Sequence, residues 1–221
     1  WFNGWIMTGN LVGLSSLLAF VFWENRVAVP LIPMTLFKNK EYVLLLAITF
    51  ITVFYTIAIN SYLPMAVQDI LQAGASASGS LQLPKTIVLI LVPTAFGIWV
   101  SKKQSHTWMA LALACIFVII PCALLVFVGI HMPIWFIMLM VGLTGIADAF
   151  RSVAATPAAQ QVLKPSDLGI GTSMIGFIIT LSNSIAATVD GIAYDSLSAA
   201  TPGIVGMTQG VDTTFLISAG V

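Results

Sequence analysis

Long apolar runs alternate along this chain with short polar gaps, and the basic residues are confined almost entirely to every second gap. Six of the runs reach or approach about 20 residues, the length that a helix needs to cross a hydrocarbon core about 30 Å thick. The runs are roughly Gly4–Trp23, Tyr42–Val67, Leu83–Val100, Thr107–Ile130, Pro133–Ser152, Leu168–Asp190 and a last one from Thr213. This pattern predicts a chain that crosses a membrane repeatedly.

The distribution of Lys and Arg predicts which ends of the runs share a compartment. The chain has eight such residues; all but Lys85 fall in the first, third and fifth gaps or, like Arg151, at the edge of one. Because positively charged loops of membrane proteins stay in the cytoplasm, we expect residues 24–41, 101–106 and 153–167 there. The spans also lead us to expect a location in the plasma or inner membrane.

The composition agrees with a membrane protein and excludes other classes. Hydrophobic residues make up 59% and charged residues 7% of the chain, whereas about a quarter of the residues of a soluble domain are charged. The formal net charge is zero, so we expect no nucleic acid partner. In lipid every backbone polar group needs an internal partner, which requires these spans to be helices. The predicted fold is therefore an all-α polytopic helix bundle.

Three parts are predicted along the chain. Residues 1–23 form a separate span, residues 24–41 form a cytoplasmic loop held extended by Pro30 and Pro33, and residues 42–221 form a six-helix bundle. The last run offers about 13 Å of helix, and the chain begins at a Trp, so we expect a fragment with an incomplete last helix. The six spans divide into two triplets of opposite topology, a recurrent device in transporters.

A polar stripe in the second run contains the first candidate site residues. Its members recur at intervals of three or four and so share one helix face: Thr49, Thr52, Thr56 and Asn60. This face either packs against a neighbouring helix through hydrogen bonds or lines an aqueous cavity. We assign the four residues to a substrate-binding cavity.

The sixth run carries a second stripe, made of small and polar residues. Its members are Ser173, Gly176, Thr180, Asn183, Ala187, Asp190 and Tyr194. Small residues let membrane helices approach closely, so we expect this face to be a packing surface in which Asn183 contacts substrate. We expect the same packing role for two glycine pairs, Gly9 with Gly13 and Gly142 with Gly145.

Ionisable residues within the spans are functional candidates, because a charge in hydrocarbon is unfavourable. Asp148 lies about 22 Å along the fifth run, so we expect it inside the core near the cytoplasmic edge. Arg151 follows three residues later, near enough for a salt bridge. Asp148 is thus either a structural anchor or a carboxylate that handles protons. Asp190, about 33 Å along its run, is expected at the outer boundary.

Motifs of enzymes and of metal or nucleotide sites were sought and are missing from the sequence. His106 and His131 fall in loops on opposite sides of the membrane, and there is no paired-cysteine motif, phosphate-binding Gly-Lys loop or Gly-x-Ser-x-Gly elbow. We therefore expect no enzymatic activity, no metal and no cofactor. Energy for transport would come from an ion gradient or from another part of the protein.

Short loop motifs occur in a fixed order along the chain. They are Glu24-Asn25-Arg26, Pro30-Leu31-Ile32-Pro33, Leu36-Phe37-Lys38-Asn39, Leu71-Gln72, Gly74-Ala75-Ser76-Ala77-Ser78-Gly79, Leu83-Pro84 and Leu168-Gly169-Ile170-Gly171-Thr172-Ser173. In this order they resemble loops of the fourteen-helix drug–proton antiporters of the major facilitator superfamily, the EmrB/QacA type. The resemblance covers essentially the whole chain as helices eight to fourteen and implies a missing N-terminal half.

The resemblance implies a proton-coupled exporter of small hydrophobic or amphipathic compounds that works by alternating access. Its partners would be substrate, protons and the lipid bilayer. Gly97, Ser101, Lys102 and Lys103 look like a degenerate copy of the superfamily's Gly-x-x-x-Asp-Arg-x-Gly-Arg loop, with Ser101 in place of the Asp. The alternatives are a superfamily transporter of another solute, such as a sugar, peptide, siderophore or metabolite, and a membrane enzyme or scaffold without transport.

Overall fold

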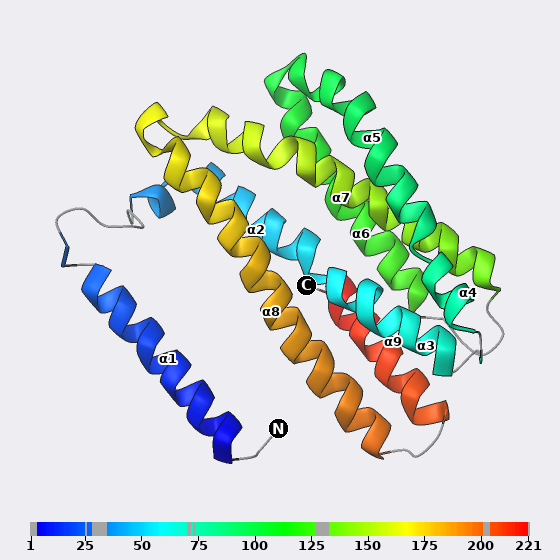
Figure 1. Cartoon of the computed structure of the whole chain (residues 1–221). Helices are drawn as coiled ribbons and strands as arrows, with labels where there is room; N and C mark the ends of the chain where they lie inside the picture. The colour runs from blue at the N-terminus through cyan, green and yellow to red at the C-terminus, as the bar shows by residue number, and fades with distance from the viewer. Residues whose placement is uncertain are drawn as a thin grey trace.

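The computed structural model describes residues 4–24, 26–27, 35–69, 72, 74–126, 133–200 and 204–220, and every regular element in these ranges is helical (Figure 1). The elements are α1 (Gly4–Glu24), η1 (Leu36–Lys38), α2 (Lys40–Phe54), η2 (Ala58–Tyr62), α3 (Leu63–Asp69), α4 (Ala75–Ser80), α5 (Leu83–Ser101), α6 (Gln104–Leu125), α7 (Ile134–Val162), η3 (Pro165–Asp167), α8 (Leu168–Ala200) and α9 (Ile204–Gly220). The predicted all-α fold is confirmed. Among the loop positions named above, Asn25, Pro30–Pro33, Leu71 and His131 lie outside the described residues.

Six helical segments in the described part of the chain are long and apolar enough to cross a membrane. They are Met7–Glu24, Lys40–Gln68, Ser76–Ser101, Gln104–Leu125, Ile134–Val162 and Pro165–Ser198. Each corresponds to one of the first six predicted runs, so hydropathy located the spans correctly. The ends of several spans differ from the predicted ones, and these differences change the depth of the charged residues.

The third span begins earlier than its apolar run. Ala75–Ser80 is helical as α4, although this stretch resembles an outer loop in sequence. Its Ser78 Oγ donates to the carbonyl of Pro64 at 3.0 Å and accepts from Gln68 Nε2 at 3.0 Å, which ties α4 to α3. Alanine and serine continue a helix without raising its hydropathy, so the run misses them. Lys85 therefore lies well inside a span and not at the beginning of one.

Two later helices continue past their predicted ends. α7 ends at Val162 rather than Ser152, so residues 153–162 are helix and not loop. α8 ends at Ala200 rather than Asp190. In both cases the added turns consist mainly of small residues, which favour or tolerate a helix but do not extend the apolar run.

These longer helices move the two acids of the spans. Asp148 lies at the midpoint of the 29-residue α7, and not near the end that was expected in the cytoplasm. Asp190, which was expected at the outer boundary, is 0% exposed within the bundle and lies more than two helical turns before α8 ends. α8 has 33 residues and is about 50 Å long, so distance along it overstates depth across a 30 Å core if the helix is tilted.

The last helix also begins earlier than predicted, at Ile204 rather than Thr213, and has 17 residues. Glycine and polar residues in its first turns give it the sequence character of a loop. At Gly210 the reason for a glycine is visible, because a Cβ at this position would lie 2.9 Å from Cδ2 of Tyr194. The missing side chain lets α9 approach α8 closely.

A π-helical turn, Ala58–Tyr62, joins α2 to α3 inside one span. In this register the N–H of residue 64 would donate to the carbonyl of Ile59, but Pro64 has no N–H. Gln82 Nε2 replaces it and donates to the Ile59 carbonyl at 3.1 Å. The proline therefore accounts for the irregular turn, and a side chain at the start of α5 satisfies the freed carbonyl.

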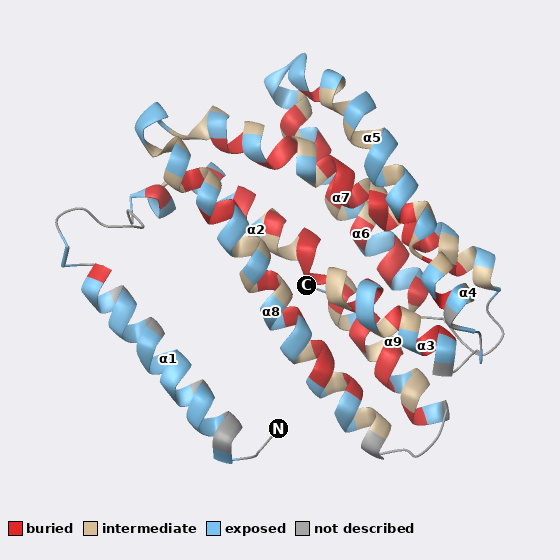
Figure 2. Ribbon diagram, viewed as in Figure 1, coloured by how far each residue is buried: buried red, intermediate tan, exposed pale blue. Residues whose placement is uncertain are grey.

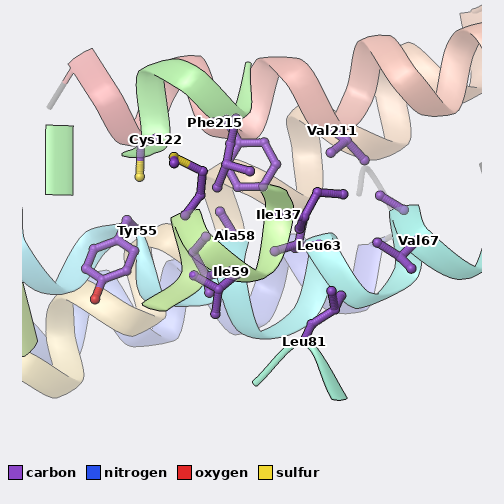
Figure 3. Close-up of a cluster of buried hydrophobic side chains, with 14 of the residues drawn as sticks. Tyr55, Ala58, Ile59, Leu63, Val67, Leu81, Cys122, Ile137, Val211 and Phe215 are labelled. Atoms are coloured by element: carbon purple, nitrogen blue, oxygen red, sulfur yellow. The ribbon is translucent and has the colours of Figure 1, made fainter. Parts of the chain in front are cut away.

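The buried side chains form two apolar clusters at different depths of the bundle. The first is drawn in Figure 3 and includes Tyr55, Ile59, Leu63, Leu125, Ile137, Val211 and Phe215. The second includes Tyr42, Leu45, Leu111, Phe150, Ala158 and Ile175. α7 contributes to both clusters and is extensively buried, whereas most of α5 and nearly all of α1 are exposed (Figure 2).

The predicted glycine contacts are confirmed for one of the two pairs. A Cβ at Gly142 or Gly145 would lie 3.2 Å or 3.1 Å from α5. Around Gly9 and Gly13 nothing lies within 4 Å, and α1 is drawn apart from the other helices in Figure 1. The expected packing of α1 through these glycines is therefore not found among the described residues.

Candidate functional site: a buried charge cluster

Three charged side chains meet between α5 and α7. Lys85 Nζ lies 3.0 Å from Asp148 Oδ2, and Arg151 Nη2 lies 3.1 Å from Asp148 Oδ1. Lys85 and Asp148 are each only 7% exposed, so the cluster is enclosed by protein. The pair of Asp148 with Arg151 expected from their spacing is confirmed, and Lys85 is an additional partner that the sequence interpretation left unassigned.

The cluster forms because two glycines of α7 let α5 come close. A Cβ at Gly145 would lie 3.1 Å from Cα of Lys85, and one at Gly142 would lie 3.2 Å from Cβ of Pro84. Asp148 follows Gly145 by three residues and therefore lies on nearly the same face of α7. Gly142 and Gly145 thus set the distance between α5 and α7, and this short distance lets Lys85 reach the carboxylate of Asp148.

Tyr55 closes the cluster from the side of α2. It follows Phe54 directly at the end of that helix, and it is 0% exposed. Its hydroxyl donates to the carbonyl of Thr144 at 3.0 Å. Lys85 Nζ lies 5.3 Å from the centroid of the Tyr55 ring, within the range of a cation–π interaction. Residues of three spans, α2, α5 and α7, therefore converge at this point.

The electrostatics of the cluster are unbalanced, with two cations around one carboxylate. Removing one partner of a buried ion pair typically destabilises a protein by about 3–5 kcal/mol, because the remaining charge is left without compensation. Arg151 Nε is itself buried without a hydrogen-bond partner in the described part of the chain. Both oxygens of Asp148 contact cations, so a proton or another cation would have to compete with Lys85 or Arg151 for it.

One signal in the sequence pointed to Lys85. It is the only basic residue outside the alternating gaps. A lysine within an apolar run needs an anionic partner, because an isolated ammonium group in hydrocarbon is strongly unfavourable. Periodicity along the chain does not indicate which acid of another span this partner is.

The residues of the polar stripe of α2 differ in how far the fold buries them. Thr49 and Thr52 are 0% exposed, and their hydroxyls donate to carbonyls one turn back in α2, at 2.8 and 2.7 Å. Thr56 is half-buried, and Asn60 is exposed on the π-helical turn. The structure thus places two members of the stripe inside the bundle and brings the other two toward its surface.

The stripe of α8 is divided as well. The expectation of a packing face is met at Asp190 and Tyr194, which are buried. It is not met nearer the start of the helix, where the stripe is exposed: Ser173, Gly176 and Thr180. Asn183 lies between these parts and is half-buried, with its Oδ1 atom enclosed but lacking a hydrogen-bond partner among the described residues.

The residues of the degenerate loop motif lie at the junction of α5 and α6. Gly97 and Ser101 are in the last turns of α5, and the connection consists of Lys102 and Lys103. The junction is held by His106, whose ring stacks on Trp99 with centroids 4.4 Å apart. Residues from this junction and from α7 line a hollow of about 400 Å³, among them Gly97, Ser101, Lys103, Gln160 and Gln161.

In the described ranges, no three or more His, Cys, Asp and Glu side chains come together as a metal site would require. The charge cluster is held by ion pairs and a hydrogen bond among its own side chains.

Comparison with known proteins identifies transporters as relatives, although no family model matches the chain. The MFS-type transporter ppz2 of Metarhizium majus is 25% identical over 168 residues, which are 76% of this chain and 29% of that protein. An uncharacterized MFS-type transporter of Mycobacterium tuberculosis is 27% identical over 101 residues, 45% of this chain and 15% of that protein. The multidrug transporter protein MdtP of Bacillus subtilis is 28% identical over 101 residues, 45% of this chain and 19% of that protein.

The chain spans less than a third of the length of these curated relatives. Their names support the major facilitator superfamily, which MFS abbreviates, and transporters of this kind are not enzymes, in agreement with the expectation for this chain. Together with the six candidate spans, the relatives indicate that the chain is an integral multi-pass membrane protein similar to MFS-type transporters.

Proposed function

We propose that this chain is part of a major facilitator transporter of the EmrB/QacA type that exports small hydrophobic or amphipathic compounds in exchange for protons. The observation that carries the proposal is the charge cluster at the midpoint of α7, where Lys85 and Arg151 contact Asp148. Ionisable groups within membrane spans are expensive and mark transport pathways and ion relays. The relative named a multidrug transporter supports this substrate class.

In this proposal residues 42–221 form one helical bundle of the carrier. Residues 1–23 form a separate helix, and residues 24–41 form a cytoplasmic loop that connects the two. The exposed surface of α1 and its separation from α8 in Figure 1 support this division. The relatives are more than three times as long as the matched segment, which supports a second bundle contributed by an N-terminal half.

The substrate would bind between the two bundles, against polar groups near the surface of this one. Thr56, Asn60 and Asn183 have the partial exposure that contact with a substrate requires. Polar side chains are unfavourable against lipid, so an aqueous cavity is the environment that suits them. Thr49 and Thr52 lie deeper and would reach the substrate only after a movement of α2.

An efflux assay tests the proposal in cells that produce the full-length protein. Cells loaded with ethidium should lose its fluorescence faster than cells without the protein, and an uncoupler that collapses the proton gradient should abolish the difference. Equal retention with and without the protein would refute export of this substrate class. Faster uptake of a sugar or peptide would instead identify another solute.

Two substitutions test the assignment of the cavity. Asn60→Leu and Asn183→Leu should each slow ethidium efflux by about tenfold, which corresponds to about 1.4 kcal/mol of lost interaction. Thr94→Val on the exposed, apolar face of α5 is the control and should leave efflux unchanged. If both leucine variants transport like the unmodified protein, these residues do not line the path.

A further inference from the structure

Asp190 is a buried carboxylate that has no partner in the described structure. Its side chain is 0% exposed, and neither Oδ1 nor Oδ2 has a hydrogen-bond partner. The ion pairs among the described residues join Asp148 to Lys85 and Arg151, and none of them includes Asp190. An acid in this position within a span needs a physical explanation, because buried polar groups are nearly always paired.

The buried face of α8 that carries Asp190 is packed against α9. Ala186 and Tyr194, one turn away on either side, lie on the same buried face of α8. Tyr194 belongs to the cluster that contains Val211 and Phe215 of α9, which is drawn in Figure 3. α9 approaches this face closely because position 210 is a glycine. Asp190 is thus enclosed where two helices meet.

The titratable groups around Asp190 carry no positive charge. Tyr62 of the π-helical turn and Cys122 of α6 lie near enough to Asp190 for an electrostatic interaction. Tyr194 and Asp195 follow Asp190 by four and five residues on α8, and the neighbouring helix α9 carries the half-buried Asp212. Lys85 lies near Cys122 as well, but its ammonium group contacts Asp148 at 3.0 Å.

An ionised carboxylate is not compatible with this environment. Moving an isolated charge into a medium of low dielectric constant is so unfavourable that in proteins the group becomes neutral instead. Burying the neutral acid costs only the loss of its hydrogen bonds to water, which is far less unfavourable. A metal site made of acidic, histidine or cysteine side chains would require several of them together, and the described residues offer no group of three or more.

We propose that Asp190 is a proton-binding site of the membrane span, occupied by a proton in the conformation described here. The proton is released when water reaches the carboxyl group between α8 and α9. In that step the O–H bond breaks, its electron pair stays on the carboxylate, and the proton passes to water. The coupled proton is then bound at Asp190 and not at Asp148, because both oxygens of Asp148 contact cations; the charge cluster of Lys85, Asp148 and Arg151 remains part of the proposed transport pathway.

The occupancy of Asp190 by a proton does not depend on the transport activity, whereas its role in coupling rests on the proposed function. Infrared spectroscopy of the purified full-length protein tests the first part. At neutral pH the spectrum should contain a C=O band of a protonated carboxylic acid that disappears in Asp190→Asn. Asp195→Asn, which changes an exposed acid on the same helix, should retain the band. An unchanged band in Asp190→Asn would overturn the proposal.

Transport measurements in proteoliposomes test the role in coupling. Asn resembles the protonated acid, so Asp190→Asn should still exchange ethidium across the membrane but should no longer accumulate it in response to a pH gradient. Asp190→Glu should restore at least part of the response, because it restores the titratable group. A pH-driven accumulation in Asp190→Asn equal to that of the unmodified protein, or one that follows a sodium gradient instead, would remove Asp190 from the coupling mechanism.

The two tests separate the failure of this inference from that of the proposed function. If the unmodified protein exchanges no ethidium at all, the proposed export function fails, while the infrared band still decides whether Asp190 holds a proton. If the unmodified protein exchanges ethidium and both variants behave like it, the transport function stands and the assignment of Asp190 is wrong.

Discussion

Replacing Asp148 by Asn should be among the most destabilising single changes in the bundle. The substitution keeps the size of the side chain but removes the carboxylate that pairs with both Lys85 and Arg151, the only one to do so among the described residues. Two charges 3.0 Å apart attract each other by about 5 kcal/mol at an effective dielectric constant of about 20. The loss leaves an enclosed lysine without a counter-charge, and we expect a decrease of about 3–5 kcal/mol in the free energy of unfolding.

A second substitution should reverse most of this effect. In Lys85→Met combined with Asp148→Asn, the enclosed cation is removed together with its partner. Arg151 remains, but its side chain is 16% exposed and can turn its charge toward water. We expect the double variant to lie within about 2 kcal/mol of the unmodified protein, because neutral replacements of a buried pair are often well tolerated.

Thermal unfolding of the full-length protein in detergent, followed by circular dichroism, measures both effects. Asp148→Asn should lower the midpoint temperature by on the order of 10 °C. Glu41→Gln, which neutralises an exposed acid in the first turn of α2, is the control and should change stability by less than about 1 kcal/mol. The reasoning is refuted if Asp148→Asn unfolds at the temperature of the unmodified protein, or if the double variant is no more stable than Asp148→Asn alone.

Two further predictions concern helix packing and the π-helical turn. Gly145→Ala should destabilise the protein by about 1–3 kcal/mol in the same assay, because the new Cβ meets the backbone of α5. The same substitution at the exposed Gly176 should stabilise it by about 0.5–1 kcal/mol, and equal effects at both positions would contradict the close contact. Gln82→Leu leaves the Ile59 carbonyl unpaired, at a cost of about 1–3 kcal/mol, and hydrogen exchange around the turn should accelerate. Gln209→Leu on an exposed face is the control, and unchanged exchange in Gln82→Leu would show that its amide does not support the turn.

The number and approximate position of the spans follow from hydropathy, but their ends do not. Membrane helices in this chain continue through alanine, serine and glycine, which support or tolerate a helix without contributing to an apolar run. This is why Ala75–Ser80 and residues 153–162 are helical where loops were expected. The depth of Asp190 stays a prediction, because a helix can be longer than the membrane is thick and distance along α8 does not fix its position across the membrane.

Contacts within one helix were more predictable than contacts between helices. Asp148 and Arg151 are three residues apart, so their pairing follows from helix geometry. The pairing of Lys85 with Asp148 depends on the packing of α5 against α7, which no pattern along the chain encodes. Likewise, Thr49 and Asn60 share the spacing of one helix face, but the π-helical turn and the neighbouring helices give them different exposure.

The bond from Gln82 to the π-helical turn has a mechanical consequence. Gln82 and Ser78 attach the segment before α5 to two backbone carbonyls of the second span, one within the π-helical turn and one just after it. A displacement of α3 would therefore also displace the start of α5 at Gln82, which is only three residues before Lys85. The π-helical turn and the ion pair of Lys85 with Asp148 are then mechanically connected, so that a displacement of α3 strains this ion pair.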